Sequence, residues 1–346
     1  MKKLSLFNKF LFLINSISLT LLLLAYLSPF INPNLIWPIS FLGLIFPLLY
    51  ITNLIFLIYW FILIKKQIWA NIIILLIGIQ YIDDFVAFHS YEKSNKKTIK
   101  IMTYNVRLFN LYNWIPELNK QNIVDFLNRE DSDILCIQEF YTKDDFPQMT
   151  YKYNHISMQK KINPGYMAIY SNYPQINKST IKVDGKAMNN TCIYSDIIIN
   201  NDTVRIYNIH LASNWFKKTD YNLIRKPNKK TIKKDLKGII YRMKQSYKIR
   251  ANEALIIREH MQNSPFSIIV CGDLNDTPLS FAYNKIKGDL TDTFKKYSHG
   301  IGQSFIEIPA LRIDYILHDK KFNSLNYYKK KKIFSDHYAI VAEIEL

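Results

Sequence analysis

The sequence of 346 residues is poor in cysteine and glycine, and one long stretch of it carries no charge. Its 3 cysteines are too few for a disulfide framework, so a packed core or a membrane must stabilise the fold. Acidic residues are scarce, with 28 Asp and Glu against 45 Lys and Arg and a net charge of +17. This balance favours anionic partners such as nucleic acid, anionic lipid headgroups or phosphorylated small molecules. The 49% hydrophobic content excludes wholesale disorder.

No Lys, Arg, Asp or Glu occurs between Lys9 and Lys65. Because about 20 helical residues cross a bilayer core of about 30 Å, this stretch has room for two spans. A turn signal with Pro33 and two asparagines divides it, and we place the spans at 10–31 and 37–64. A cleaved signal peptide also begins with lysines, but this apolar stretch is too long for one and a second span follows at once.

A third apolar run, over 68–88, determines which side of the membrane the rest of the chain occupies. It is short for a span, so a third span and a helix at the membrane surface are both open interpretations. Lysines in the first nine residues and the Lys65-Lys66 pair predict two cytoplasmic segments. Three spans then place the remainder outside the cytoplasm, and two spans place it inside. We expect a multi-pass protein of a bacterial inner (cytoplasmic) membrane with an extracytoplasmic domain.

The pattern beyond the apolar part is that of a folded domain. We predict an anchor over 1–90, a linker over 91–98 and one α/β domain over 99–346. Short runs rich in β-branched residues predict buried strands. These runs lie at 99–104, 134–137, 166–170, 192–199, 204–209, 267–271, 313–317 and 338–344. Helical patterns lie between some of them, at 115–128 and 231–261, and strands mixed with helices predict an α/β fold.

Polar residues follow these strands where the strands end. Taken singly, each fits a turn or a solvated loop. Taken together they predict a site, because a sheet holds such residues rigidly while the loops leave them open. The set is Asn105, Glu139, His210, Asp273, Asn275, Asp314, Asp336 and His337. Carboxylate and amide oxygens suit Mg²⁺ or Mn²⁺ rather than Zn²⁺, and a histidine beside an aspartate can serve as an acid or an electrostatic stabiliser.

Six ordered motifs make residues 99–346 resemble the endonuclease/exonuclease/phosphatase superfamily. These are Thr103-Tyr104-Asn105-Val106-Arg107, Ile137-Gln138-Glu139, Asn208-Ile209-His210-Leu211, Cys271-Gly272-Asp273-Leu274-Asn275-Asp276-Thr277-Pro278, Arg312-Ile313-Asp314-Tyr315-Ile316-Leu317 and Ser335-Asp336-His337. The resemblance implies a four-layer α/β sandwich of two mixed β-sheets flanked by helices, here preceded by transmembrane helices. It also implies metal-dependent hydrolysis of a phosphoester.

The resemblance implies a Mg²⁺ site, with Mn²⁺ as the alternative ion. Glu139 is the expected direct ligand, and Asn105 and Asp336 are expected to help hold the ion or its waters. The ion would neutralise charge on the phosphoryl oxygens.

The resemblance also implies the catalytic roles. Asp273 is expected to orient and deprotonate the attacking water. Asn275 is expected to donate to a non-bridging phosphate oxygen, and Asn105 also belongs to the expected substrate-binding set. His337, held by Asp314, is expected to face the phosphate in its protonated form. His210 is expected to be a second phosphate contact or a general acid.

A basic segment over 217–250 leaves the substrate open. It holds 13 Lys or Arg against 2 acidic residues. It is either a solvated face or a surface that meets the phosphates of nucleic acid or anionic lipid. We expect a phosphodiester-hydrolysing enzyme, most simply of the nuclease type. The alternatives are a sphingomyelinase-like phospholipid phosphodiesterase, a phosphomonoesterase, and a non-catalytic membrane protein that binds phosphate. The expected partners are a phosphoester and the lipid bilayer.

Overall fold

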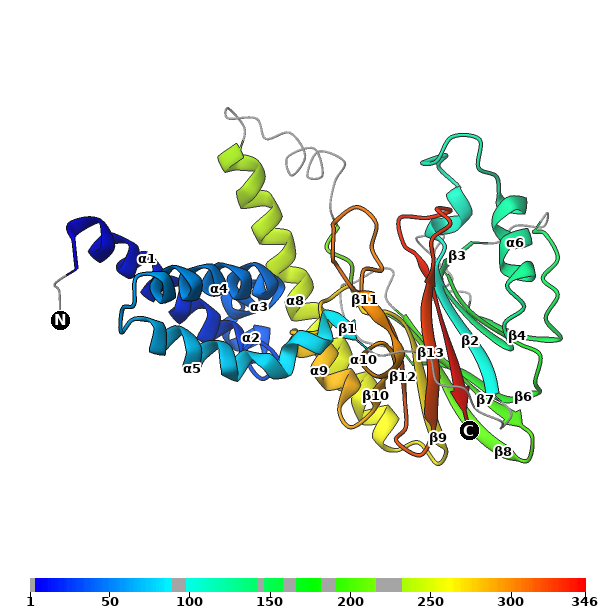
Figure 1. Ribbon diagram of the computed structural model, residues 1–346. Helices are drawn as coiled ribbons and strands as arrows, with labels where there is room; N and C mark the ends of the chain where they lie inside the picture. The colour runs from blue at the N-terminus through cyan, green and yellow to red at the C-terminus, as the bar shows by residue number, and fades with distance from the viewer. Residues whose placement is uncertain (1–3, 89–97, 142–145, 158–165, 182–190, 216–231) are drawn as a thin grey trace.

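The computed structural model describes residues 4–88, 98–141, 146–157, 166–181, 191–215 and 232–346. A bundle of N-terminal helices lies beside a β-sandwich that contains most of the chain (Figure 1). The predicted linker and the first half of the basic segment lie mostly outside the described residues.

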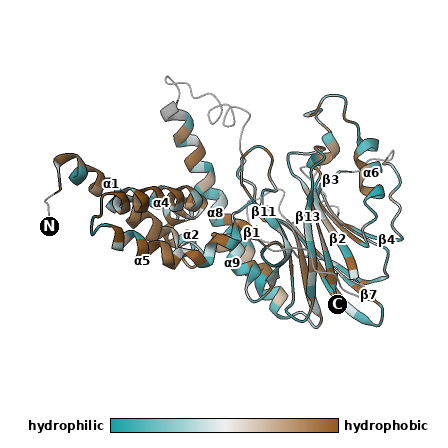
Figure 2. Ribbon diagram, in the orientation of Figure 1, coloured by the Kyte–Doolittle hydropathy of each residue, from teal (hydrophilic) through white to brown (hydrophobic). Residues whose placement is uncertain are grey.

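The N-terminal helices are apolar on their outer surfaces as well as where they touch one another (Figure 2). They are α1 Leu6–Ala25, α2 Pro33–Ile36, α3 Pro38–Leu44, α4 Phe46–Ile62, α5 Ile68–Gly78 and the 3-10 helix η1 Ile79–Asp84. In α1, Leu6 is 84% exposed and Phe7 is 65% exposed. The core helix of a soluble protein buries such residues, and exposed apolar surface of this kind marks an interaction surface for protein or membrane.

The number of predicted spans needs correction. In the described part of the chain, α1 is the one helix that is long and apolar enough to cross a membrane by itself. The predicted span over 37–64 is split into α3 and α4, which meet at an angle of 67° and are long and apolar enough only as a bent pair, either a broken span or a re-entrant loop. The described helices therefore provide one span, or two where the bent pair counts as one. Pro47 in the first turn of α4 has no N–H and fixes its own φ, so a new helix starts there. The predicted third run forms α5, whose 11 residues reach only about 16 Å.

Polar side chains cross-link the bundle from within. Asn15 and Asn71 exchange amide hydrogen bonds of 3.0 and 2.9 Å, and Trp60 Nε1 donates to Asn15 Oδ1 at 2.8 Å. Asn53 accepts from Asn15 at 3.3 Å and donates to Ser18 at 2.9 Å. All five side chains are buried, so these bonds fix the alignment of α1, α4 and α5 in an otherwise apolar interior.

Two six-stranded mixed sheets form the sandwich, as the sequence predicts. Their orders are β10-β12-β9-β8-β7-β6 and β13-β14-β2-β3-β5-β4, and a small β1-β11 ribbon lies beside the bundle. The strands are β1 Val86–Phe88, β2 Thr98–Asn105, β3 Ile134–Phe140, β4 Tyr153–Ser157, β5 Tyr166–Ser171, β6 Gln175–Ile181, β7 Thr191–Ile199, β8 Asp202–His210, β9 Ser267–Asp273, β10 Thr291–Asp292, β11 His299–Ile301, β12 Asp314–His318, β13 Asn323–Lys330 and β14 Ala339–Glu345. The pairs β2-β3 and β8-β9 are parallel.

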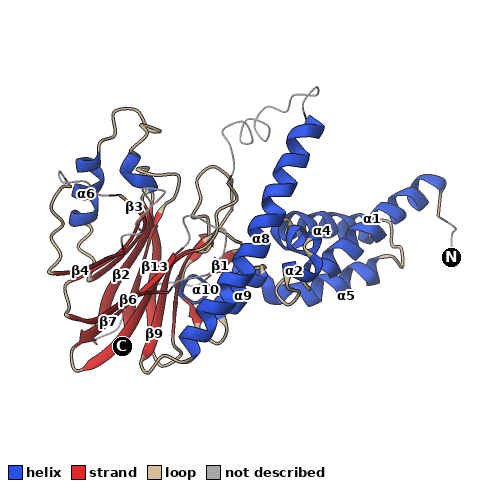
Figure 3. Cartoon of the chain, turned by 180° about the vertical axis from the view of Figure 1, so that it is seen from behind, coloured by secondary structure: helices blue, strands red, loops and turns tan. Residues whose placement is uncertain are grey.

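Helices cover the outer face of each sheet, which completes the four layers (Figure 3). The helices of this part are η2 Arg107–Asn110, α6 Lys120–Arg129, α8 Ile232–Gln262, α9 Phe281–Lys287 and α10 Thr293–Tyr297. Leu127 of α6 packs on the β2-β3 sheet, and Ile257 of α8 packs on the β8-β9 sheet. Between the sheets, a core that includes Ile101, Ile206 and Ile340 is fully buried.

Candidate active site

The ends of several strands meet at one edge of the sandwich. The parallel pair β8-β9 sets His210 beside Asp273, and the antiparallel β12 sets Asp314 opposite Asp273. Asn105 ends β2 in the second sheet, and its amide reaches across to Asp273 at 3.1 Å. The structure brings together all of the residues that the sequence singles out. These are Asn105, Glu139, His210, Asp273, Asn275, Asp314, Asp336 and His337.

Gly272 makes the close approach of β8 and β9 possible. Its φ is +141°, and a Cβ placed there would lie 1.9 Å from the carbonyl oxygen of Ile209. Only glycine tolerates both this conformation and this contact. The glycine therefore positions Asp273 beside His210.

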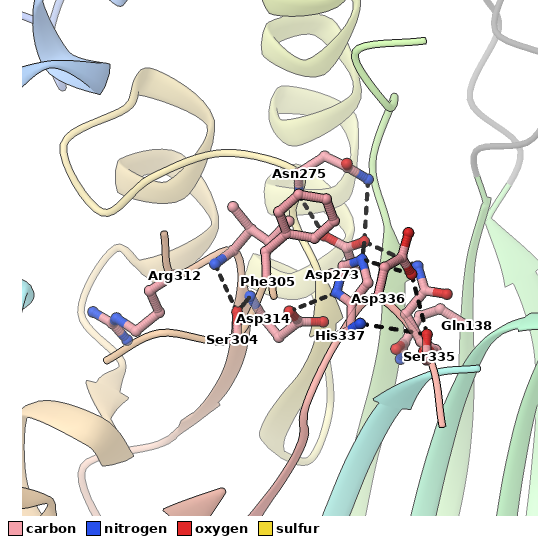
Figure 4. Close-up of polar contacts among 12 residues, drawn as sticks. Gln138, Asp273, Asn275, Ser304, Phe305, Arg312, Asp314, Ser335, Asp336 and His337 are labelled. Atoms are coloured by element: carbon pink, nitrogen blue, oxygen red, sulfur yellow. Dashed lines mark hydrogen bonds and ion pairs between the residues drawn. The ribbon is translucent and has the colours of Figure 1, made fainter. Parts of the chain in front are cut away.

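His337 lies between two buried carboxylates (Figure 4). Its Nδ1 is 2.9 Å from Asp314 Oδ2, and its Nε2 is 3.7 Å from Asp273 Oδ2. Burial lowers the pKa of His337, but the Asp314 and Asp273 carboxylates outweigh it and raise the pKa to about 10. The ring is therefore an imidazolium at neutral pH, with a positive charge fixed beside the cavity.

Asp273 is held by amide donors on both of its oxygens. Its Oδ1 accepts from the backbone N–H of Asn275 at 2.8 Å, and its Oδ2 accepts from the Asn105 amide. The Asn275 amide is 3.3 Å from the same Oδ2. Burial raises the pKa of Asp273 to about 6, with Asp314 adding to the rise and the histidines opposing it. This places Asp273 in the range where a carboxylate can accept a proton near neutral pH.

Glu139 leaves the strand ladder through a local distortion. Its φ is +51°, and the pairing of β3 with β5 shifts register between Ile137 and Phe140. A bulge of this kind re-aims a side chain, and here the carboxylate lines the cavity. Burial and the nearby Asp336 carboxylate raise the pKa of Glu139. Asn105 donates to Glu139 Oε1 at 3.2 Å.

Asp336, in the last motif, is oriented by Arg107 of the first motif and by its own neighbour Ser335. Arg107 Nε lies 3.3 Å from Asp336 Oδ2, and Ser335 Oγ lies 3.1 Å from Asp336 Oδ1. Ser335 also donates to the backbone carbonyl of Asn105 at 2.8 Å, which ties this motif to the end of β2. Arg107 stacks on Trp114 with 4.5 Å between its guanidinium carbon and the ring centroid. The sequence did not single out Arg107 as a site residue.

Two groups of ligand atoms could hold a cation. Asp273, Asp314 and His337 bring ligand atoms within 4.8 Å of one another. In that group, however, the imidazolium occupies the place between the carboxylates and offers no lone pair. Glu139 and Asp336 form the better site, because the Asp336 carboxylate raises the pKa of Glu139 and a cation between the two carboxylates would relieve this repulsion. In this conformation the Asn105 amide nitrogen, rather than its oxygen, faces Glu139.

His210 contributes an unpaired nitrogen to the site. Its Nε2 lies 3.7 Å from Asp273 Oδ2 and 3.8 Å from Glu139 Oε1, and no described residue bonds to it. Burial lowers the pKa of His210, with Asp273 opposing this effect. A buried ring nitrogen without a partner is costly unless a ligand or a water meets it.

The cavity at this edge has an apolar lining that the sequence did not reveal. Its volume is about 230 Å³, and both the polar residues described above and apolar residues line it. The apolar lining residues are Leu44, Trp215, Met243, Tyr247, Phe305, Ile308, Leu311 and Ile313. Apart from Ile313 they belong to no motif, and they come from distant parts of the chain, so only the folded structure brings them together.

Two packed mixed sheets with carboxylates, amides and histidines gathered at one edge are typical of a class of phosphoester hydrolases. The chain belongs to the endonuclease/exonuclease/phosphatase family, whose model matches residues 102–337. Enzymes of this family hydrolyse phosphoester bonds. The N-terminal part matches a separate family, described as a domain of unknown function (DUF8431), over residues 8–85. A search of curated proteins found no match.

Solved structures share the fold at low sequence identity. The catalytic domain of human Nocturnin, with bound sulfate, is 14% identical with a TM-score of 0.51, over 72% of this chain and 94% of that one. A mannosyl-6-phosphatase from Bacteroides thetaiotaomicron is 16% identical with a TM-score of 0.51, over 72% of this chain and all (100%) of that one. A conserved protein of unknown function from Enterococcus faecalis is 15% identical with a TM-score of 0.52, over 71% and 99%.

Proposed function

We propose that this protein is a membrane-anchored, Mg²⁺-dependent enzyme that hydrolyses phosphodiester bonds, with Mn²⁺ as the alternative ion. The observation that carries the proposal is the arrangement around Asp273. This carboxylate is fixed by amide donors, its pKa of about 6 suits a base, and a histidine cation lies 3.7 Å away. Such an arrangement can deprotonate water on one side and stabilise a phosphate on the other.

The proposed roles follow from this geometry. Asp273 orients the attacking water and takes its proton. The His337 imidazolium, held by Asp314, binds the phosphoryl oxygens on which negative charge increases. Asn275 donates to one of these oxygens, and His210 meets the phosphate or supplies a proton to the leaving oxygen.

The proposed metal site consists of Glu139 and Asp336, with Asn105 beside them. When bound there, Mg²⁺ would neutralise charge on the phosphoryl and leaving oxygens. For Asn105 to act as a ligand its amide must rotate, because its nitrogen faces Glu139. In its present orientation Asn105 donates to both Glu139 and Asp273, which keeps these two carboxylates at a fixed separation.

The N-terminal bundle is the proposed membrane anchor. The exposed apolar surface of α1 supports this, as does the length of α1. The start of α1, which contains Lys9, and the connection from α4 to α5, which contains Lys65-Lys66, lie at the end of the bundle away from the sandwich (Figure 1). At that end Tyr59 donates to Asn8 at 2.7 Å. If these lysines are cytoplasmic, the sandwich lies on the opposite side of the membrane. The bacterial inner membrane as its location stays a prediction.

The test is hydrolysis of bis(4-nitrophenyl) phosphate by the full chain in detergent, with Mg²⁺ added. We expect release of 4-nitrophenolate, its loss on chelation by EDTA, and its recovery when Mg²⁺ or Mn²⁺ is restored. Hydrolysis that persists in EDTA would overturn the metal dependence. Absence of hydrolysis by a folded protein, on this diester and on 4-nitrophenyl phosphate, would overturn the proposed reaction.

A further inference from the structure

The cavity is built from two parts of the protein that differ in chemistry. The carboxylates and histidines come from the strand ends of the sandwich. Leu44 comes from the C-terminal end of α3 and so belongs to the N-terminal bundle. Met243 and Tyr247 come from α8, which passes between the bundle and the sheets (Figure 1). The apolar lining residues, here called the apolar wall, thus come partly from the proposed anchor.

Direct contacts hold the end of the bundle against the cavity. Phe41 of α3 packs edge-on against Tyr247, with ring centroids 5.4 Å apart. Asn34 donates to Asn252 of α8 at 2.9 Å, and Asn284 of α9 donates to the carbonyl of Pro29 at 3.0 Å. These contacts come from the segment after α1, from α2 and from α3. The apolar wall is therefore a fixed part of the site.

The exposed part of α8 has the character of a helix at a membrane surface. Leu236, Ile240 and Tyr241 are 44%, 42% and 64% exposed. This end of α8 extends beyond the sandwich on the side of the bundle, as views from opposite sides agree (Figures 1 and 3). Lys244 in the same part of α8 lies 5.4 Å from the ring of Trp37. Exposed apolar residues among lysines are typical of helices that lie in the headgroup region.

Apart from the His337 imidazolium, the cations among the described lining residues are Arg107 and Arg250. Arg107 is paired with Asp336, and the buried Arg250 lies 3.0 Å from Asp276. These cations do not form a track for a nucleic acid backbone, because such binding depends on cations that follow successive phosphates. The described lining instead combines His337 and carboxylates with apolar residues.

From these observations we infer that the substrate is a phosphoester of a membrane lipid. This inference rests on the proposed function. The phosphate lies among Glu139, Asp273 and His337, and the apolar part of the lipid lies along Leu44, Met243 and Tyr247. Water attacks phosphorus, and the bond from phosphorus to one ester oxygen breaks. Asp273 takes a proton from the water and the leaving oxygen gains one, which gives an alcohol and a phosphate.

The experiment compares two substrates that differ only in their apolar part. These are 4-nitrophenyl methyl phosphate and 4-nitrophenyl hexadecyl phosphate, and both are given to the full chain in the same detergent with Mg²⁺. We expect kcat/KM for the hexadecyl substrate to be at least about tenfold higher, because its chain is buried against the wall. In Leu44→Ser we expect the ratio of the two values to fall about tenfold. Leu311→Ser, on the sandwich side of the wall, is a second variant for the same measurement.

Leu35→Ser is the matched control, because Leu35 lies in α2, is 81% exposed and does not line the cavity. Partitioning of the hexadecyl substrate into detergent is the same for each variant, so it cancels in the comparison. Equal rates on both substrates would overturn the lipid inference and leave the proposed reaction intact. Cleavage of plasmid DNA without a hexadecyl preference would favour nucleic acid instead. Absence of hydrolysis of either substrate by a folded protein would count against the proposed function itself.

Discussion

Asp273 is held by several polar contacts inside the site. Its two oxygens accept from Asn105 and from the backbone and side chain of Asn275, while His337 lies at 3.7 Å. Asp273→Asn keeps the size of the side chain but removes the carboxylate that is proposed to act as the base. We expect kcat to fall by about 10²–10³-fold, as when one main catalytic group is removed. The measurement is hydrolysis of bis(4-nitrophenyl) phosphate.

Asp289→Asn is the control for this substitution, because the Asp289 side chain is 89% exposed. We expect its activity to match that of the unchanged chain. The unfolding midpoint of Asp273→Asn should stay within a few degrees or rise, since a buried carboxylate with a raised pKa is replaced by a neutral amide. A variant with nearly full turnover would remove Asp273 from the proposed mechanism.

His318 does not line the cavity, and its burial makes the stability of the protein depend on pH. It is fully buried, its Nδ1 lies 2.8 Å from the carbonyl oxygen of Asp319, and its Nε2 lies 3.1 Å from Ser324 Oγ. Burial lowers the pKa of His318 below the usual 6.5. The unfolded chain therefore binds a proton near pH 6.5 before the folded chain does. The stabilising contribution is complete above that pH and is lost as the pH falls toward the lowered pKa.

We expect His318→Gln to show a smaller loss of stability between neutral and mildly acidic pH than the unchanged chain. The measurement is the unfolding midpoint of the full chain across this range. His299→Gln is the control, because His299 is exposed in the folded protein as in the unfolded one. Identical pH profiles for the unchanged chain and His318→Gln would show that His318 does not contribute.

At the scale of elements, the strands that the sequence revealed are those with an apolar run. Ile134–Phe140 and Asp202–His210 are central strands, and both contain such runs. The strands β4, β6 and β13, which have 5, 7 and 8 residues, were not predicted. All three lie at sheet edges, where one side is exposed and polar residues are tolerated. Hydrophobic periodicity alone therefore finds the centre of each sheet and misses its borders.

The site likewise has residues that the sequence predicts and residues that it does not. The residues at strand ends were predicted because each follows a strand and matches a family motif. Leu44 and Tyr247 were not, because they line the cavity only through the packing of α3 and α8 on the sandwich. The orientation of the Asn105 amide toward Glu139 also depends on neighbours that are distant in the chain. The sequence thus indicated the phosphoesterase family but not the apolar wall of the cavity.

Asn15 is the centre of the polar network that holds α1, α4 and α5 together. In Asn15→Leu, Trp60 Nε1 and Asn71 each lose a partner while they stay buried. We expect the free energy of unfolding to fall by about 1–2 kcal/mol. The measurement is denaturant unfolding of the full chain in detergent, followed by tryptophan fluorescence.

Thr20→Val serves as the control in the same helix. Thr20 is exposed and donates only to the backbone carbonyl of Ser16, so its replacement leaves the network intact. A loss of stability in Thr20→Val equal to that in Asn15→Leu would assign the effect to the helix rather than to the network.

At the scale of the whole molecule, Gly43 marks how closely the bundle approaches the sandwich. A Cβ at this position would lie 2.5 Å from the carbonyl oxygen of Leu279 and 2.3 Å from Ser28 Oγ. Gly43→Val must therefore push α3 away from the sandwich, at a cost of about 1–3 kcal/mol. We expect a lower unfolding midpoint and faster proteolysis between the two parts.

Gly238→Val in α8 is the matched control, because the nearest atom to its added Cβ is the flexible end of Arg242 at 3.3 Å. An unchanged midpoint in Gly43→Val would mean that the bundle and the sandwich can separate freely. The apolar wall would then not be a fixed part of the site.

The path of the chain through the bundle predicts on which side of the membrane the sandwich lies. α1 runs toward the sandwich, α3 and α4 run away from it, and α5 returns (Figure 1). Lys9 and Lys65-Lys66 therefore share the far end, and the positive-inside rule makes that end cytoplasmic. All three native cysteines are buried, so an added surface cysteine is the one expected to react in the folded protein.

We expect Asp289→Cys, on the sandwich, to react in intact cells with a maleimide that cannot cross the membrane. Lys66→Cys, at the far end of the bundle, should react only after the cells are permeabilised. The two variants control for each other, since each side chain is exposed in the folded protein. The reverse pattern would place the sandwich in the cytoplasm. The site would then take its lipid from the cytoplasmic leaflet, because Leu44 and the cavity lie at the end of the bundle that meets the sandwich.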